Sequence, residues 1–234
     1  MVSLDDAVVA RLARFGTTYE ILVDPDGTEK LLDKETIADD EILDVMAVDD
    51  VFVDWSEGER ASDEQLTKGF ETTDVATIAR RILDEGEIQL TQEQRKRMLE
   101  AKHKRILTTI ARETWNPQTR TPHPKERIER ALTEAKWRAD PLRRVEEQVQ
   151  AAFKLLRPLL PIAFDRVRVA IKIPAEHAGA AYGHIRNLGD LRKEEWQNDG
   201  SWVGVLEMPA GAQLEVYDRL NGLTQGSVET KLLD

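Results

Sequence analysis

The chain has 234 residues, no cysteine, a net charge of −11 at pH 7 and an apolar content of 41%. This length and composition allow one to three domains, each with a buried core. The missing cysteines exclude disulfides, thiolate nucleophiles and Cys-ligated metal sites. We find no N-terminal signal segment and no apolar run of the ~20 residues that a membrane helix needs, so we expect a cytoplasmic protein with no membrane partner.

The charge is distributed unevenly along the chain. Residues 1–86 hold 8 Lys and Arg against 23 Asp and Glu, residues 87–161 hold 17 against 10, and residues 162–234 hold 8 against 11. A basic block inside an acidic chain indicates a polyanionic partner that is met by one surface.

The acidic excess has two interpretations, a solvated surface without a specific partner or an organism with a very salty cytoplasm. The preference for Arg (21) over Lys (12) favours the second. At ~1 M salt the Debye length is about 3 Å, so only close charge contacts survive, and the forked Arg side chain suits those.

The first third predicts a mixed α+β domain. Val8–Phe15 and Thr18–Val23 are partly alternating apolar segments that form a hairpin near Gly16. The composition of Asp24–Gly27 predicts a turn, and a short helix is expected from Glu29.

Three more elements complete this third. Val48–Trp55 is rich in β-forming residues and predicts a strand. Ser62 and Gln65 have capping-box spacing, so a helix is expected from there to Phe70. Thr73–Glu85 is amphipathic and predicts a helix that ends at Gly86.

The middle third predicts a three-helix bundle. A capping box at Thr91 opens a helix to about Thr114, and the three prolines of Asn116–Pro124 break it. A second helix is expected around Ile128–Ala135. A third is expected from Asp140, as N-cap before a proline, through the apolar stripe that ends at Leu156.

The last third alternates strands and helices in the order expected of a ferredoxin-like sandwich. The expected strands are Phe164–Ile173, Leu191–Gln197, Ser201–Met208 and Ser227–Leu233, and the expected helices are Pro174–Leu188 and Pro209–Leu223. The predicted domains are therefore residues 1–88, 89–161 and 162–234, with linkers near Gly86–Thr91 and Pro158–Ile162.

The sequence does not support catalysis. It contains no phosphate-binding glycine loop, and its four histidines lack paired metal-ligand spacing, so we expect neither an enzyme nor a cofactor or metal. Trp196 and Trp202 flank a turn, and we interpret them as core anchors in preference to a functional aromatic stack.

The basic block carries the functional signal. Arg95, Lys102, Arg105 and Arg112 recur at helical spacing, so one helix face is predicted to follow a phosphate backbone. Further cations follow in the proline-bounded loop and at the start of the next helix, namely Arg120, Lys125, Arg127 and Arg130. The alternative is a solvated bundle surface. Because no base-reading motif is present, we expect structured RNA to be recognised by shape and phosphate.

Several short segments, spread over the whole chain, can be compared with a known family. They are Val51-Phe52-Val53, Ser56-Glu57-Gly58, Ile82-Leu83, Gly86-Glu87-Ile88-Gln89-Leu90-Thr91, Asn116-Pro117-x-Thr119-x-x-Pro122, Ile128-Glu129-Arg130-Ala131, Ile171-Lys172-Ile173-Pro174 and Glu194-Glu195-Trp196-x-x-Asp199-Gly200-Ser201-Trp202. In these segments the chain resembles the Shwachman–Bodian–Diamond syndrome (SBDS) protein family of ribosome maturation factors, in particular its archaeal members. One departure lies at Glu71, where family members commonly carry glycine.

The resemblance implies an N-terminal FYSH-type α/β domain, a central helical bundle and a C-terminal ferredoxin-like domain. It implies a monomer that binds rRNA on the intersubunit face of the large ribosomal subunit and assists release of the anti-association initiation factor, with an elongation-factor-like GTPase as a further partner. Met1–Asp6 would lie toward the peptide exit tunnel, and Arg120, Arg127 and Arg130 would contact rRNA.

Two other classes of function stay open on the sequence. One is an adaptor of an RNA-processing complex such as the exosome, which tighter binding to short free RNA than to ribosomal subunits would favour. The other is an RNA-modifying enzyme, which substrate turnover would be needed to establish.

Overall fold

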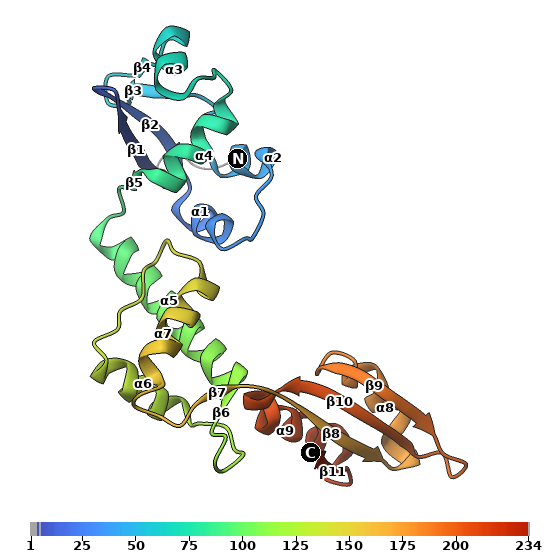
Figure 1. Ribbon diagram of the computed structural model, residues 1–234. Coiled ribbons are helices and arrows are strands. Elements are labelled where there is room, and N and C mark those ends of the chain that lie inside the picture. The colour runs from blue at the N-terminus through green and yellow to red at the C-terminus, as the bar shows by residue number, and fades with distance from the viewer. Residues whose placement is uncertain (1–3, 5, 234) are drawn as a thin grey trace. The chain divides into compact units, whose positions relative to one another are not determined.

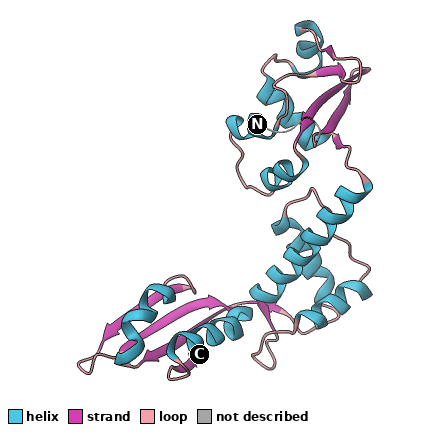
Figure 2. Cartoon of the chain, turned by 180° about the vertical axis from the view of Figure 1, so that it is seen from behind, coloured by secondary structure: helices cyan, strands magenta, loops and turns pink. Residues whose placement is uncertain are grey.

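The computed structural model describes Leu4 and residues 6–233, which form two compact units. Unit 1 contains the described chain up to Lys102 together with Ala139–Val145, and unit 2 contains His103–Arg138 and the chain from Glu146 onward (Figures 1 and 2). Of the segment Met1–Asp6, expected to lie toward the exit tunnel, only Leu4 and Asp6 are described, so that prediction lies outside the described residues.

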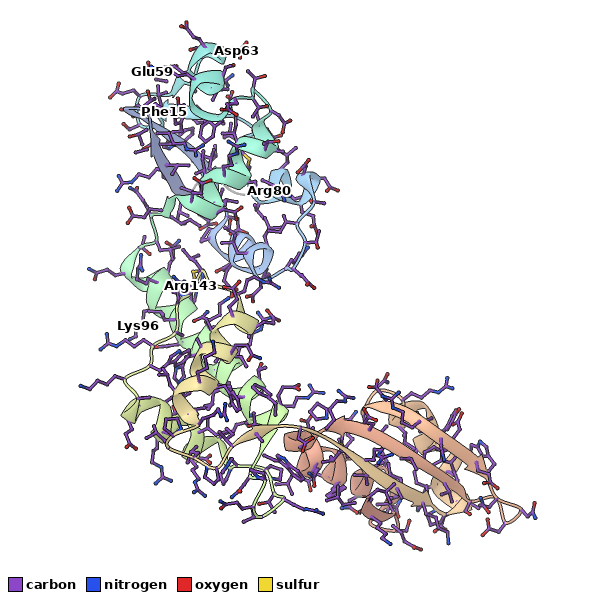
Figure 3. The ribbon with its side chains drawn as sticks, in the orientation of Figure 1. Phe15, Glu59, Asp63, Arg80, Lys96 and Arg143 are labelled. Atoms are coloured by element: carbon purple, nitrogen blue, oxygen red, sulfur yellow. The ribbon has the colours of Figure 1, made fainter. Side chains whose placement is uncertain are left out.

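A five-stranded sheet organises unit 1. Its strand order is β4-β3-β2-β1-β5, with β1 Val8–Arg14, β2 Thr17–Val23, β3 Phe52–Asp54, β4 Glu59–Arg60 and β5 Glu87–Ile88. The predicted hairpin is confirmed: β1 and β2 pair antiparallel through the two-residue turn Phe15-Gly16, whose residues both have positive φ. Figure 3 shows Phe15 at the tip of this hairpin.

Two predictions in unit 1 are wrong. Asp24–Gly27 is not a free turn but the start of helix α1 (Pro25–Leu32), because the Asp24 side chain accepts hydrogen bonds from the Asp26 and Gly27 amides. Proline is favourable at the first position of a helix, so this segment of turn-forming residues begins a helix instead. Helix α2 (Asp39–Val45) was not predicted. The strand expected over Val48–Trp55 is shorter in the structure, where it forms β3 (Phe52–Asp54).

The two remaining helices of unit 1 follow their predicted caps. Helix α3 (Asp63–Phe70) starts with the capping box of Ser62 and Gln65, and helix α4 (Val75–Glu85) ends at Gly86. The family departure at Glu71 falls on the C-cap of α3, where the residue has φ +64°. This left-handed conformation is the one that glycine adopts without strain, and the turn forms with glutamate in its place.

Helix α5 (Gln92–Glu113) begins with the predicted Thr91 capping box and runs through the boundary of the two units. In unit 2, β6 (Thr114–Trp115) follows it and pairs with β7 (Ala163–Phe164). Helices α6 (Lys125–Glu134) and α7 (Val145–Leu156) complete the helical part (Figure 1).

The predicted start of the third helix at Asp140 is wrong. The Asp140 carboxylate accepts a hydrogen bond from the amide of Leu142, which makes a local turn, and the helix begins only at Val145. The Val145 amide donates to Asp33 Oδ1 at 3.0 Å, so a carboxylate distant in sequence serves the start of α7.

The C-terminal part is a four-stranded antiparallel sheet covered by two helices. In chain order its elements are β8 Arg166–Ile173, α8 Ala175–Ile185, β9 Asp190–Trp196, β10 Trp202–Pro209, the short turn η1 Ala210–Ala212, α9 Gln213–Thr224 and β11 Glu229–Leu233. The sheet order is β11-β8-β10-β9. Figure 2 shows both helices on one face of this sheet.

Burial alternates along β8, as expected of a strand with one face against the helices. Val167, Val169, Ile171 and Ile173 are buried, whereas Arg166, Arg168 and Lys172 are exposed. Trp202 is fully buried on the helix side of β10, and its ring fills the space above Gly204, where a Cβ atom would lie 2.2 Å from the ring.

Because the Trp202 ring has no room to move, we predict that Gly204→Ala lowers the free energy of unfolding of the C-terminal part by about 2 kcal/mol. The matched control is Gly222→Ala on α9, where a Cβ meets no atom within 4 Å, and this variant should gain about 1 kcal/mol from helix propensity. Thermal unfolding followed by near-UV circular dichroism measures both, and equal melting temperatures for the two variants would contradict the packing described for Trp202.

Candidate nucleic-acid interface

The eight cations predicted to bind RNA fall into two groups in the structure. Seven of them are exposed, namely Arg95, Arg105, Arg112, Arg120, Lys125, Arg127 and Arg130. Lys102 is different, because only 2% of its surface is accessible.

The prediction that Lys102 faces RNA is wrong. Its ammonium lies 2.5 Å from Glu29 Oε1 and 3.1 Å from Asp33 Oδ1, both on or next to α1. Removing a cation from water costs several kcal/mol unless carboxylates replace the lost hydration, and these two do so. Lys102 therefore ties the first half of α5 to α1 inside unit 1, and its charge is not available to a phosphate.

In unit 2, the second half of α5 and the start of α6 bring three cations together. Lys125 Nζ donates to Thr108 Oγ1 at 3.3 Å, which places the first turn of α6 against the middle of α5. Thr108 stands three residues after Arg105 and four before Arg112, so all three share one face of the helix. Arg105, Arg112 and Lys125 thus gather around Thr108.

Arg120 lies in a loop that its own hydrogen bonds hold in shape. The Asn116 amide donates to the Thr121 carbonyl oxygen at 2.9 Å, and the Arg120 amide donates to the Asn116 carbonyl oxygen at 2.8 Å. His123 is buried and its Nε2 lies 3.0 Å from the Pro161 carbonyl oxygen. These hydrogen bonds hold both ends of the loop in place, and we call it the fastened loop. Arg120 is exposed on it and has a left-handed backbone conformation with φ +55°.

Arg127 and Arg130 are exposed on α6, and Arg130 Nε donates to the Glu126 carbonyl oxygen at 3.3 Å. With the residues above they define what we call the basic surface of unit 2: Arg105, Arg112, Arg120, Lys125, Arg127 and Arg130. Arg95 lies apart from this set, in the half of α5 that belongs to unit 1.

A hollow beside the basic surface contains two cations that the sequence analysis missed. It is lined by Trp115 and Arg120 from the β6 region and by Arg166 and Arg168 from β8. The alternating Arg-Val-Arg-Val pattern at the start of β8 was the available signal, because alternation on a strand puts both arginines on the exposed face.

Arg166 is already engaged by carboxylates on the same sheet. It pairs with Asp190 at 2.6 Å and with Glu207 at 3.1 Å, and Arg192 also pairs with Glu207 at 3.0 Å. Hydrogen bonds from Arg192, and after it Arg166, hold the pKa of the Glu207 carboxyl below its usual range. Arg166 therefore adds little net positive charge to the hollow.

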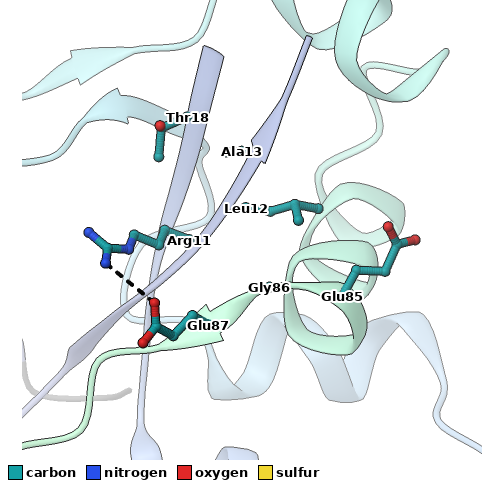
Figure 4. Close-up of a pocket in the computed structure, with 7 residues that line it drawn as sticks. All are labelled: Arg11, Leu12, Ala13, Thr18, Glu85, Gly86 and Glu87. Carbon is teal, nitrogen blue, oxygen red and sulfur yellow. Dashed lines mark hydrogen bonds and ion pairs between the residues drawn. The ribbon is translucent and has the colours of Figure 1, made fainter. Parts of the chain in front are cut away.

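The acidic unit 1 also neutralises several of its own cations. Figure 4 shows a hollow along β1 and β5 in which Arg11 pairs with Glu87, at a distance of 3.3 Å. Gly86 is required there, since a Cβ would lie 2.4 Å from two carbonyl oxygens. Arg14 pairs with Glu85, which lines the hollow, at 3.5 Å. Because Arg11 is paired and two carboxylates line it, this hollow offers no excess positive charge to an anion.

Among the described residues, no group of three or more His, Asp or Glu side chains is arranged to hold a metal ion. No helix in the described part of the chain is long and apolar enough to cross a membrane.

Comparison with known proteins identifies the class. Residues 6–96 match the family model for the SBDS N-terminal domain, residues 104–165 match SBDS domain II, and residues 167–234 match the SBDS C-terminal domain. The chain therefore belongs to the SBDS family of non-enzymatic ribosome maturation proteins, as its resemblance to that family indicated.

Full-length relatives support this assignment. The chain is 49% identical to the "Ribosome maturation protein SDO1 homolog" of Methanothermobacter thermautotrophicus, over 100% of both chains. It is 39% identical to the protein of the same name in Aeropyrum pernix, over 99% of this chain and 98% of that one. It is 27% identical to "Ribosome maturation protein SBDS" of Caenorhabditis elegans, over 98% and 90% of the two chains.

These matches fix the general role and architecture. The protein acts in ribosome maturation, and its three domains are the SBDS N-terminal domain, the helical domain II and a C-terminal domain with a four-stranded sheet and helices. The exact domain limits predicted from the sequence stay predictions.

The burial of Lys102 gives a test that separates stability from RNA binding. Lys102→Met removes the cation between two carboxylates, so we expect a loss of about 3 kcal/mol in the unfolding free energy of unit 1. Lys104→Met, two residues away and exposed, is the matched control and should change stability by less than about 0.5 kcal/mol. Chemical denaturation measures both, and equal stabilities would contradict the buried pairing of Lys102.

Proposed function

We propose that this protein binds ribosomal RNA on the intersubunit face of the large subunit and assists release of the anti-association initiation factor. The observation that carries the proposal is the basic surface of unit 2, which presents six exposed cations on a chain whose net charge is −11. The printed names of the full-length relatives support ribosome maturation as the process.

The shape of the basic surface favours phosphate contact over base reading. Its cations come from the face of α5 around Thr108, from the fastened loop that carries Arg120 and from the first turns of α6. A fastened loop costs less conformational entropy on binding than a free one. Arginine side chains contact phosphates in pairs of hydrogen bonds, which suits recognition of folded RNA by shape.

The domain assignments extend the proposal. The order β11-β8-β10-β9, with a helix after β8 and another after β10, supports a ferredoxin-like fold for the C-terminal domain. The five-stranded sheet of unit 1, with helices α1 to α4, supports a FYSH-type N-terminal domain, and α5, α6 and α7 support a three-helix bundle. We propose that the C-terminal domain meets an elongation-factor-like GTPase, that the protein acts as a monomer, and that it works in the cytoplasm.

The basic surface is tested by charge reversal. The variant Arg120→Glu/Arg127→Glu/Arg130→Glu should reduce co-sedimentation with purified large subunits at least about tenfold, because it removes phosphate contacts and adds repulsion. The slope of log affinity against log salt should fall by about 2. The matched control reverses three exposed cations outside the surface, Lys30, Lys68 and Arg219, which changes the net charge equally and should keep binding.

Three results would count against the proposal. Equal binding of the wild-type protein to large subunits, small subunits and free RNA would favour the RNA-processing adaptor. Large-subunit binding that survives the triple reversal would show that other residues make the contact. Equal losses of large-subunit binding in the triple variant and in its control would show that binding depends only on the net charge of the protein.

A further inference from the structure

The two tryptophans that flank the β9–β10 turn have different environments. Trp202 is fully buried and fills the core, as the sequence analysis expected, whereas Trp196 keeps 50% of its surface exposed. Trp196 is therefore not a core anchor, and that interpretation of it is wrong. An exposed tryptophan on an edge strand of an otherwise charged surface needs another explanation.

Trp196 belongs to an ordered group of side chains. The Tyr182 ring on α8 lies 5.8 Å from the Trp196 ring, and the Arg186 guanidinium lies 5.3 Å from the centre of the Tyr182 ring. Tyr182 Oη donates to Glu194 Oε1 at 3.2 Å, and Arg186 lies 4.0 Å from the same oxygen. Glu194 thus orients both neighbours. We call Trp196, Tyr182 and Arg186 the aromatic shelf.

Two glycines on α8 leave part of the helix surface next to the shelf without side chains. Gly179 and Gly183 are exposed, one helical turn apart, and a Cβ at either would meet no atom within 4 Å. Glycine inside a helix costs up to about 1 kcal/mol relative to alanine, and packing within the protein gives no reason for it here. A bare helix face lets a ligand approach the backbone closely beside Tyr182 and Arg186.

We propose that the aromatic shelf binds an unpaired RNA base, which stacks on Trp196 while its sugar and phosphate pass over Gly179 and Gly183 toward Arg186. This inference rests on the proposed rRNA-binding function and adds a second, C-terminal contact to it. Base stacking on tryptophan, tyrosine and arginine planes is how proteins commonly hold unpaired nucleotides. The exposed Arg186 guanidinium, which lies 4.0 Å from Glu194, has five N–H groups and can donate hydrogen bonds to the phosphate.

The size of the patch favours a base over a protein partner. A stable protein interface buries about 800 Å² per partner around an apolar centre. On β9 the neighbours of Trp196 are charged and exposed. Among the described residues from 167 onward, the other large exposed apolar residue is Leu214, on α9. A single RNA base is small enough to stack on one tryptophan side chain and its immediate neighbours.

The test compares two short RNA probes of equal charge. One is an unstructured oligoadenylate, and the other is an abasic ribose–phosphate oligomer of the same length. We expect the full-length protein to bind oligoadenylate about tenfold more tightly than the abasic oligomer, with quenching of tryptophan fluorescence. The preference should persist at ~1 M salt, because stacking is not screened as phosphate contacts are.

Three variants assign the preference to the shelf. Trp196→Ala should abolish it, and Trp196→Phe, which keeps an aromatic face, should retain most of it. Leu214→Ala removes an exposed apolar side chain of the same domain and should leave the preference unchanged. These measurements use free RNA, so they are independent of whether the protein co-sediments with large subunits.

Three outcomes would overturn the inference. The first is a wild-type protein that binds both probes equally, and the second is a Trp196→Ala variant with an unchanged preference. The third is a Trp196→Ala variant that also loses large-subunit binding while keeping the oligoadenylate preference, which would assign the shelf to a protein partner.

Discussion

The buried ammonium of Lys102 is the interaction on which the account of this protein depends. Two carboxylates, Glu29 and Asp33, replace its hydration, and Asp33 also accepts the amide of Val145. One acidic group thereby holds α1, α5 and the start of α7 together inside unit 1. In an acidic chain, a cation that is paired with a nearby carboxylate contributes little net positive charge. The placement of the carboxylates therefore determines which cations can attract a partner.

Three arginines outside the basic surface pair with carboxylates of their own domains, namely Arg11, Arg14 and Arg166. The basic surface of unit 2 differs in composition, because α5, the Arg120 loop and α6 together carry more cations than carboxylates. The backbone hydrogen bonds of the Arg120 loop hold that part of the basic surface in a defined conformation.

Local patterns predicted most elements, and distant contacts account for the failures. Caps at Ser62 and Thr91 marked their helices because capping is a local interaction. The start of α7 was misplaced because its first amide is served by Asp33, more than a hundred residues away. For the site, helical spacing correctly predicted that Arg105 and Arg112 share one helix face. The same spacing also included Lys102, which is buried because Glu29 and Asp33, on and next to α1, pair with its ammonium. Trp196 and Trp202 are partners across β9 and β10, so they share one face of the sheet, yet they differ in exposure because β9 is an edge strand and β10 is an inner strand. The sequence shows the turn between them but not this order of strands.

The proposed function requires the claim that the Arg120 loop lies against large-subunit rRNA. Because the chain has no cysteine, a single Gln118→Cys substitution can carry a tethered iron chelate that cleaves nearby RNA with hydroxyl radicals, with Asp218→Cys on α9 as the control position. We predict strong cleavage at a small, contiguous set of large-subunit nucleotides from Gln118→Cys, and none in small subunits. A bound protein whose Gln118→Cys probe cleaves no rRNA, or cleaves both subunits alike, would contradict the claim.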